Sequence, residues 1–229
     1  MKRTLTVLVV AAITLGLGSP AFASDGKGID AAKTAVTNRI NLRLTALQKD
    51  TTQLGAAKNL TAEHRTSLQG LITQDTSGLT ALKGTVAGET TLDGVKNDAT
   101  SMVQDYRIFM LVGPKVRLTS AGDTEQAVLT KLRSVHDTLA GLLAKVSGTD
   151  TTAAQADLAA MAAALDQAAG HLNGQVAAVL AIAPGPDAAG IQAKVTAVRT
   201  ALAAGRANLR TAADDAKKVR DFLKGISTK

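Results

Sequence analysis

A heptad pattern of apolar residues runs through most of the chain and limits its possible folds more than any other feature. In its longest unbroken stretch, apolar or small residues recur at intervals of three and four: Ile191, Val195, Val198, Leu202, Gly205, Leu209, Ala212, Ala216, Val219 and Leu223. This spacing places the side chains on one face of an α-helix, and its persistence over several heptads predicts left-handed coiled-coil packing. The sequence therefore predicts an all-α protein.

Further stretches carry the same helical spacing, and short connections separate them. We expect helices over residues 27–57, 61–87, 91–112, 123–146, 151–179 and 187–223, and a short helical piece over 115–121. Connections of a few residues make successive helices run antiparallel, and helices of about thirty residues are ~45 Å long. The sequence therefore predicts an elongated antiparallel helical bundle of five or six long helices. The bundle is either a single domain over 24–229 or two three-helix units in series, divided near residue 113.

Polar or helix-breaking residues interrupt the pattern at three places. Asp75 lies in the apolar seam of the second helix, where we expect its side chain to reach water. Gly113-Pro114 should end or kink the third helix, because proline disfavours helical geometry in the residue before it. Gly122 should end the short piece over 115–121, and Asp123 has the spacing of a capping box that starts the next helix.

The first 23 residues have the parts of a secretory signal peptide. Lys2 and Arg3 precede an almost wholly apolar run over 5–17, and Ala21-Phe22-Ala23 fits the small-x-small cleavage pattern. A membrane anchor is the alternative, but the run is shorter than the roughly 20 residues that a spanning helix needs. The chain has no cysteine to which a lipid could be attached. We expect cleavage after Ala23 and a secreted, extracellular product without a transmembrane segment.

Charge and aromatic content restrict the partners. The formal net charge is +7, and removal of Lys2 and Arg3 leaves 24 basic and 19 acidic residues, a net charge of +5. The two signs are interleaved, which is typical of solvated helix faces. The alternative is attraction to an anionic cell-wall polymer or a membrane surface. With one tyrosine and no tryptophan, the chain has almost no side chains on which bases could stack, so nucleic acid is not an expected partner.

Residues that perform catalysis or bind metals are few and scattered. No glutamate precedes a histidine by three positions, as a helical di-metal site requires, among Glu63, Glu89, Glu125, His64, His136 and His171. The three histidines lie on separate predicted helices. The chain has no cysteine nucleophile, no Gly-x-Ser-x-Gly, no phosphate loop and no His-Glu-x-x-His. We therefore expect a protein that is not an enzyme and has no catalytic, cofactor-binding or metal-binding residue.

The segment over 105–115 contains the only tyrosine and a dense group of apolar residues. Heptad spacing continues through it from Leu92 to Tyr106 and Phe109, so we expect these two rings to be core anchors against which Phe222 packs. The alternative is an interaction site that comprises Tyr106, Arg107, Lys115 and Arg117.

The same segment carries a resemblance to a known group of proteins. The Asp-Tyr-Arg-Ile-Phe run over 105–109, Pro114-Lys115 and the Ala-Gly-Asp over 121–123 resemble a pattern in uncharacterised secreted α-helical proteins of high-GC Gram-positive bacteria. The resemblance implies a secreted, helical protein, and it brings no activity and no site residues.

Two functional hypotheses follow from the leader, the heptads and the missing catalytic motifs. The first is an exported, non-enzymatic interaction or structural protein that contacts an unknown macromolecule of the cell envelope or a second copy of itself. The second is a binding module for an anionic cell-wall polymer or a membrane surface, attracted by the net positive charge.

Overall fold

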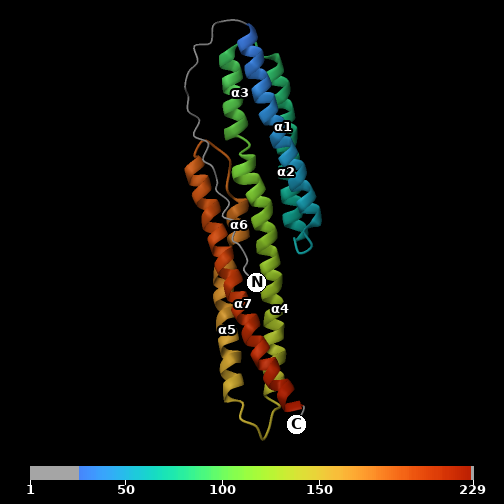
Figure 1. The fold of residues 1–229 in the computed structure, drawn as a ribbon, viewed down its shortest axis with the longest axis vertical. Coiled ribbons are helices and arrows are strands. Elements are labelled where there is room, and N and C mark those ends of the chain that lie inside the picture. Colours follow the sequence, from blue (N-terminus) through green and yellow to red (C-terminus); the bar gives the residue numbers. More distant parts are fainter. Residues whose placement is uncertain (1–25, 228–229) are drawn as a thin grey trace, which may run out of the picture.

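The protein is a long helical rod in the computed structural model, which describes residues 26–227 (Figure 1). Within these residues the chain contains no strand, and its elements are α1 (Gly26–Ala56), α2 (Ala62–Gly88), α3 (Leu92–Gln104), the π-helix η1 (Ile108–Val112), α4 (Gly113–Leu143), α5 (Thr152–Leu172), α6 (Gln175–Leu180) and α7 (Ala188–Ser227). The predicted all-α helical bundle is confirmed. The predicted signal peptide lies outside the described residues.

Two hydrophobic cores follow one another along the rod, and α4 contributes to both. The N-terminal core joins α1, α2, α3, η1 and the start of α4, and its buried members include Ile40, Leu47, Leu68, Leu79, Val95, Met102, Ile108, Val112 and Val116. The C-terminal core joins Leu111 of η1 and the rest of α4 to α5, α6 and α7, and its other buried members include Leu129, Leu139, Met161, Leu165, Leu172, Val195, Leu202, Leu209 and Val219. In Figure 1, α4 runs from beside α1 and α2 to the lower end of the rod.

The long heptad seam of α7 is buried as predicted. All its apolar members from Ile191 to Val219 lie in the C-terminal core, and Leu223 is partly buried. α5 packs against α7 more extensively than any other pair of helices among the described residues. Gly205 makes this close approach possible, because a Cβ at this position would lie 2.6 Å from Cδ2 of Leu172. The heptad pattern therefore identified the correct face of this helix.

The predicted extension of the third helix to residue 112 is wrong. α3 ends at Gln104, and Arg107 has a left-handed backbone with φ of 45° before η1 begins. This turn rotates the chain, so that Ile108, Leu111 and Val112 point inward. Phe109 is instead 58 % exposed, so the prediction that it is a core anchor is also wrong. Nor can Phe222 pack against it, because the C-terminal end of α7 lies at the far end of α4 from η1 (Figure 1).

Gly113-Pro114 does not interrupt the helix. η1 continues directly into α4, with Gly113 in helical geometry and Pro114 in the first turn. Glycine has no Cβ to clash with the proline ring, and the first turn of a helix does not need the missing proline N–H. The chain therefore passes this point as one continuous helical segment.

The predicted break at Gly122-Asp123 is absent as well, since α4 continues through it. Gly122 provides space instead, because a Cβ there would lie 2.5 Å from Cγ2 of Val176. Asp123 caps a different helix. Its Oδ2 accepts a 2.9 Å hydrogen bond from the Thr61 backbone N–H, and its carboxylate lies 2.9 Å from Nδ1 of His64, at the start of α2. Thr61 itself is the predicted N-cap of α2 and accepts a hydrogen bond from the His64 N–H.

The predicted helix over 151–179 is two helices. α5 ends at Leu172, and Gly174 has a left-handed backbone with φ of 73° that glycine adopts easily. The following α6 packs against α4 and delivers Val179 into the C-terminal core. The bend lets the chain cross from the α5 side of the rod to the segment that precedes α7.

Candidate functional site

Three of the four residues predicted as a possible interaction site are structural ties at the junction of the two cores. Arg107 is buried and donates hydrogen bonds to the carbonyl oxygens of Gly185 (2.9 Å) and Pro186 (3.0 Å). Lys115 is buried and donates to the carbonyl oxygen of Leu180 at 2.8 Å. The Tyr106 ring is half-buried against Gly78 of α2. The hydrogen bonds of Arg107 and Lys115 fasten the end of α6 and the segment before α7 to the start of η1 and to α4.

A buried carboxylate lies in this junction. Asp75 is only 7 % exposed, so the expectation that it reaches water is wrong. Burial raises the pKa of Asp75 to about 6, and the positive charge of Lys115 opposes the shift. Burial likewise lowers the pKa of Lys115, and Asp75 opposes that shift. Oδ2 of Asp75 accepts no hydrogen bond from the described residues. The apolar seam of α2 therefore contains a buried ionisable group, the carboxyl of Asp75.

Arg117, the fourth predicted residue, is exposed beside a separate hollow of about 390 Å³ between α1 and the start of α4. The exposed ring of Phe109 and the exposed side chain of Leu42 flank this hollow. The guanidinium of Arg43 lies 5.4 Å from the centre of the Phe109 ring. Burial raises the pKa of Asp50 inside the hollow, and the charge of Arg117 opposes the shift. The structure thus separates Arg117 from Arg107 and Lys115, which point into the junction.

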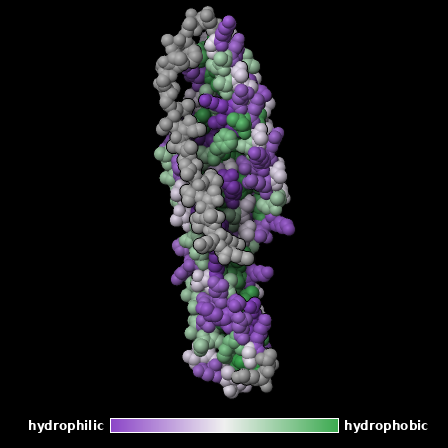
Figure 2. All heavy atoms as spheres, viewed as in Figure 1, coloured by the Kyte–Doolittle hydropathy of each residue, from purple (hydrophilic) through white to green (hydrophobic). Residues whose placement is uncertain are grey.

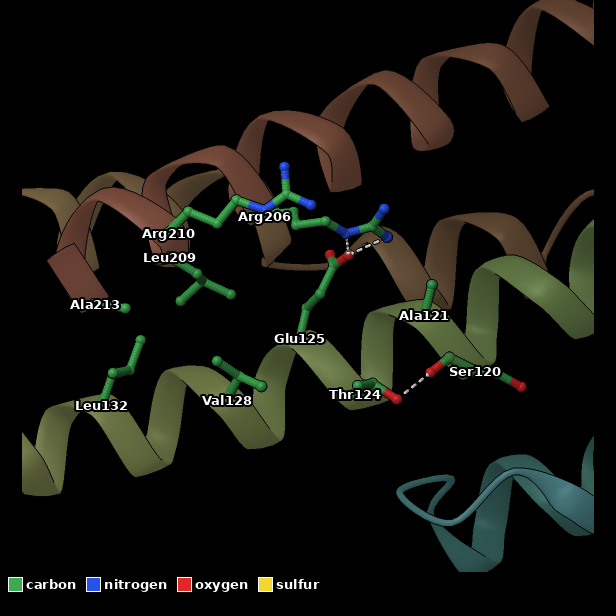
Figure 3. Close-up of a pocket in the computed structure, with 10 residues that line it drawn as sticks. All are labelled: Ser120, Ala121, Thr124, Glu125, Val128, Leu132, Arg206, Leu209, Arg210 and Ala213. Atoms are coloured by element: carbon green, nitrogen blue, oxygen red, sulfur yellow. Dashed lines mark hydrogen bonds and ion pairs between the residues drawn. The ribbon is translucent and has the colours of Figure 1, made fainter. Parts of the chain in front are cut away.

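A different surface has the form of a binding groove, and it lies between α4 and α7. Its upper hollow has a volume of about 630 Å³. Val128 and Leu132 of α4 and Leu209 of α7 point into the space between the two helices, and Ala213 borders it (Figure 3). The walls of this hollow are therefore mainly apolar.

One ion pair crosses the groove at the upper hollow. Glu125 reaches from α4 towards α7, where Nε of Arg206 donates a 2.7 Å hydrogen bond to its Oε1 (Figure 3). Burial of Glu125 raises its pKa, and the hydrogen bond and charge of Arg206 oppose the shift. Oε2 of Glu125 is buried and accepts no hydrogen bond from the described residues. The pair holds the two helices together at this level and leaves the apolar walls below it open.

A lower hollow of about 670 Å³ continues the groove towards the end of α4. Its apolar lining comes from both helices and from the turn after α4: Leu139, Leu142, Val146, Leu223 and Ile226. Lys145, Arg220 and Lys224 supply its charged lining. On the face shown in Figure 2, the lower half of the rod has green apolar areas beside purple hydrophilic clusters. We call the two hollows together the α4–α7 groove.

The predicted helix over 123–146 has apolar residues at heptad spacing, and four of them within α4 line this groove: Val128, Leu132, Leu139 and Leu142. Leu129 and Leu139 enter the C-terminal core and Leu143 is buried, whereas Val128 is 39 % exposed and Leu142 is 47 % exposed. α4 thus carries more apolar surface than α5 and α7 cover. The available signal was the width of that stripe, because apolar residues occur at 128 and 129 and again at 142 and 143. The regular spacing of these residues predicts a buried face, and this prediction is wrong for Val128 and Leu142.

The described residues 26–227 contain no group of three or more His, Cys, Asp or Glu side chains that could hold a metal ion. His64 contacts Asp123, and His136 lies 3.1 Å from its neighbour Asp137. Within the same range, no helix is both long enough and apolar enough to cross a bilayer.

Comparison with protein-family models, with curated proteins and with solved structures found no significant match to the chain.

Proposed function

We propose that this is an exported, non-enzymatic interaction protein that receives part of another macromolecule in the α4–α7 groove. The observation that supports the proposal is the pair of apolar hollows, about 630 and 670 Å³, which lie in sequence along the same two helices. Exposed apolar surface of this kind, bordered by charged side chains, is typical of protein-binding or ligand-binding sites. The leader over 1–23 motivates the exported location, and the absence of catalytic motifs in the sequence motivates the non-enzymatic role.

The arrangement of the groove supports a contact role. Leu142 lies near the end of a well-packed helix and still leaves almost half of its surface in water. Burial of an exposed leucine by a partner contributes roughly 25 cal/mol for each Å² removed from water. Because Leu142 and Val128 lie two heptads apart on α4, one elongated partner can cover both.

The test is retention of the protein by isolated cell envelopes, with two matched leucine variants. Leu142→Asp places a charge in the groove, and Leu42→Asp places the same charge at a 63 % exposed leucine of α1, away from the groove. We expect Leu142→Asp to lose retention and Leu42→Asp to keep it, while both keep the wild-type helical CD spectrum. Equal retention of the two variants would contradict a role for the groove.

Binding to an anionic wall polymer or membrane surface is the second candidate. It is favoured by the basic residues of α7 that border the groove: Arg206, Arg210, Arg220 and Lys224. Retention driven by charge alone should fall steeply between low and high salt and should be insensitive to Leu142→Ala, which removes apolar surface without adding a charge. Retention that is lost in Leu142→Ala supports the first candidate.

A further inference from the structure

Most of the charged side chains that line the α4–α7 groove are basic. Five basic side chains line its two hollows: Arg206, Arg210, Lys145, Arg220 and Lys224. The acidic lining consists of Glu125, which is already paired with Arg206, and Arg220 is paired with Asp221 beside the lower hollow. Arg210 in the upper hollow and Lys145 in the lower hollow have no ion-pair partner among the described residues. An occupant therefore meets an apolar floor with a basic cation beside each hollow.

The length of the groove suits a helix. Along α4 it extends from Ser120 to Leu142, which corresponds to roughly 33 Å at ~1.5 Å per residue, and Lys145 follows in the turn after α4. Its apolar wall repeats at heptad spacing, as in a helix seam that packs against another helix. Among the described residues 26–227, only α4, α5 and α7 pack side by side over their length in this half of the rod (Figure 1). A further helix laid over α4 and α7 completes a four-helix bundle.

We propose that the occupant is an amphipathic helix of a partner protein, with apolar residues at heptad spacing and acidic residues on the flanks of that apolar face. This inference rests on the proposed function and names the partner for the same groove. Arg210 and Lys145 lie at levels about two heptads apart, since Lys145 shares its hollow with Leu223. Acidic residues about fourteen positions apart on the partner helix therefore pair with the two cations, as e and g residues do in a coiled coil.

Other occupants fit less well. A second copy of the chain brings another basic groove and a net charge of +5 for residues 24–229, so like charges oppose the contact. A bilayer surface cannot follow the apolar residues into hollows that lie between two helices. An acidic amphipathic helix complements both the shape and the sign of the charge.

Fluorescently labelled helical peptides of three heptads test the proposal, with binding followed by anisotropy on the full chain. One peptide carries leucines at a and d and glutamates at e and g. The second has the same leucines with lysines at e and g, and the third has the composition of the first with its leucines distributed around the helix. We expect the glutamate peptide to bind at least ~10-fold more tightly than either of the others, with an affinity that falls as salt increases.

Charge reversal in the groove provides the matched variant. The double variant Arg210→Glu/Lys145→Glu should invert the preference and bind the lysine peptide more tightly. Lys58→Glu/Lys194→Glu changes the net charge equally at exposed positions outside the groove and should leave the preference unchanged. Leu142→Asp should weaken both peptides by at least ~10-fold.

Several results would overturn the inference. Equal binding of the glutamate and lysine peptides, or binding of neither, would exclude an acidic helix as the occupant. A dimer in light scattering that Leu142→Asp dissociates would identify a second copy as the occupant, and Leu142-dependent binding to phosphatidylglycerol vesicles would identify lipid. These results leave the proposed function intact if envelope retention still depends on Leu142. Loss of that dependence would contradict the proposed function itself.

Discussion

At the scale of single residues, the buried carboxyl of Asp75 controls how stability responds to pH. The pKa of this carboxyl is 3.8 in the unfolded chain and about 6 in the folded protein. Between these values the folded state binds more protons than the unfolded state, so stability falls as pH rises through the window. A pKa difference of this size corresponds to about 3 kcal/mol.

We therefore expect Asp75→Asn to become more stable relative to wild type as pH rises. The difference in unfolding free energy between variant and wild type should increase by about 3 kcal/mol from pH 3.5 to pH 7. Urea unfolding at a series of pH values measures this. Loss of the negative charge near Lys115 adds an offset, but it does not produce the change between pH 4 and 6. Asp30→Asn removes an exposed carboxylate of α1 and controls for the lost charge. A difference that stays constant over the window would refute the burial argument.

Phe109 and Ile108 are neighbours with opposite surroundings. Phe109 is 58 % exposed, whereas Ile108 is 1 % exposed in the N-terminal core. We expect Ile108→Ala to cost about 2–5 kcal/mol of unfolding free energy. Phe109→Ala should cost less than about 1 kcal/mol, because little surface and one contact with Arg43 are lost. Chemical denaturation of the two variants measures both free energies. A larger cost for Phe109→Ala would mean that Phe109, and not Ile108, lies in the core.

At the scale of helices, two glycines of α2 allow a matched comparison. A Cβ at Gly78 would lie 2.6 Å from the hydroxyl oxygen of Tyr106 and 2.7 Å from a ring carbon, whereas a Cβ at Gly84 meets nothing within 4 Å. Alanine is favoured over glycine in a helix by up to ~1 kcal/mol. We expect Gly84→Ala to raise the melting temperature and Gly78→Ala to lower it.

The clash at Gly78 should disappear when its partner is removed. In a double-mutant cycle, Gly78→Ala should cost less free energy in a Tyr106→Ala background than in the wild type. Additive effects of the two substitutions would show that Tyr106 does not pack on this face of α2.

At the scale of the whole molecule, the continuous segment of η1 and α4 couples the two cores. Ile108, Val112 and Val116 belong to the N-terminal core, and Leu129 and Leu139 belong to the C-terminal core. The hydrogen bonds of Arg107 and Lys115 to the carbonyls of Leu180, Gly185 and Pro186 add a second connection. These ties favour one cooperative unfolding transition.

Tyr106 makes this testable, because it is the only tyrosine in a chain without tryptophan. Its fluorescence reports the junction, and far-UV CD reports all the helices. We expect the two denaturation curves to coincide. Leu165→Ala, which opens a cavity in the C-terminal core, should shift both midpoints by the same amount. A CD curve with two steps, of which only one follows Tyr106, would show that the cores unfold separately.

Much of this fold is readable from the sequence. The all-α class, the start of α2 at Thr61 and the buried face of α7 all follow from spacing and capping within one segment. Predictions from the sequence were wrong where a residue contacts a segment that is distant in the chain. Gly122 makes room for Val176, and Asp123 caps a helix that begins about sixty residues earlier. Rules that consider only neighbouring residues predict a helix break at both positions. The residues that they contact lie more than fifty positions away in the sequence, so such rules do not include them.

The candidate site, the α4–α7 groove, could likewise be predicted only in part from the sequence. The sequence alone determined that Val128, Leu132, Leu139 and Leu142 share one face of a helix, since 3.6 residues per turn fix that geometry. It did not determine whether that face is covered. Only the tertiary structure decided that α5 and α7 cover Leu129 and Leu139 and leave Val128 and Leu142 partly in water. Periodicity describes one helix, whereas burial depends on how many neighbours pack around it and at what distance.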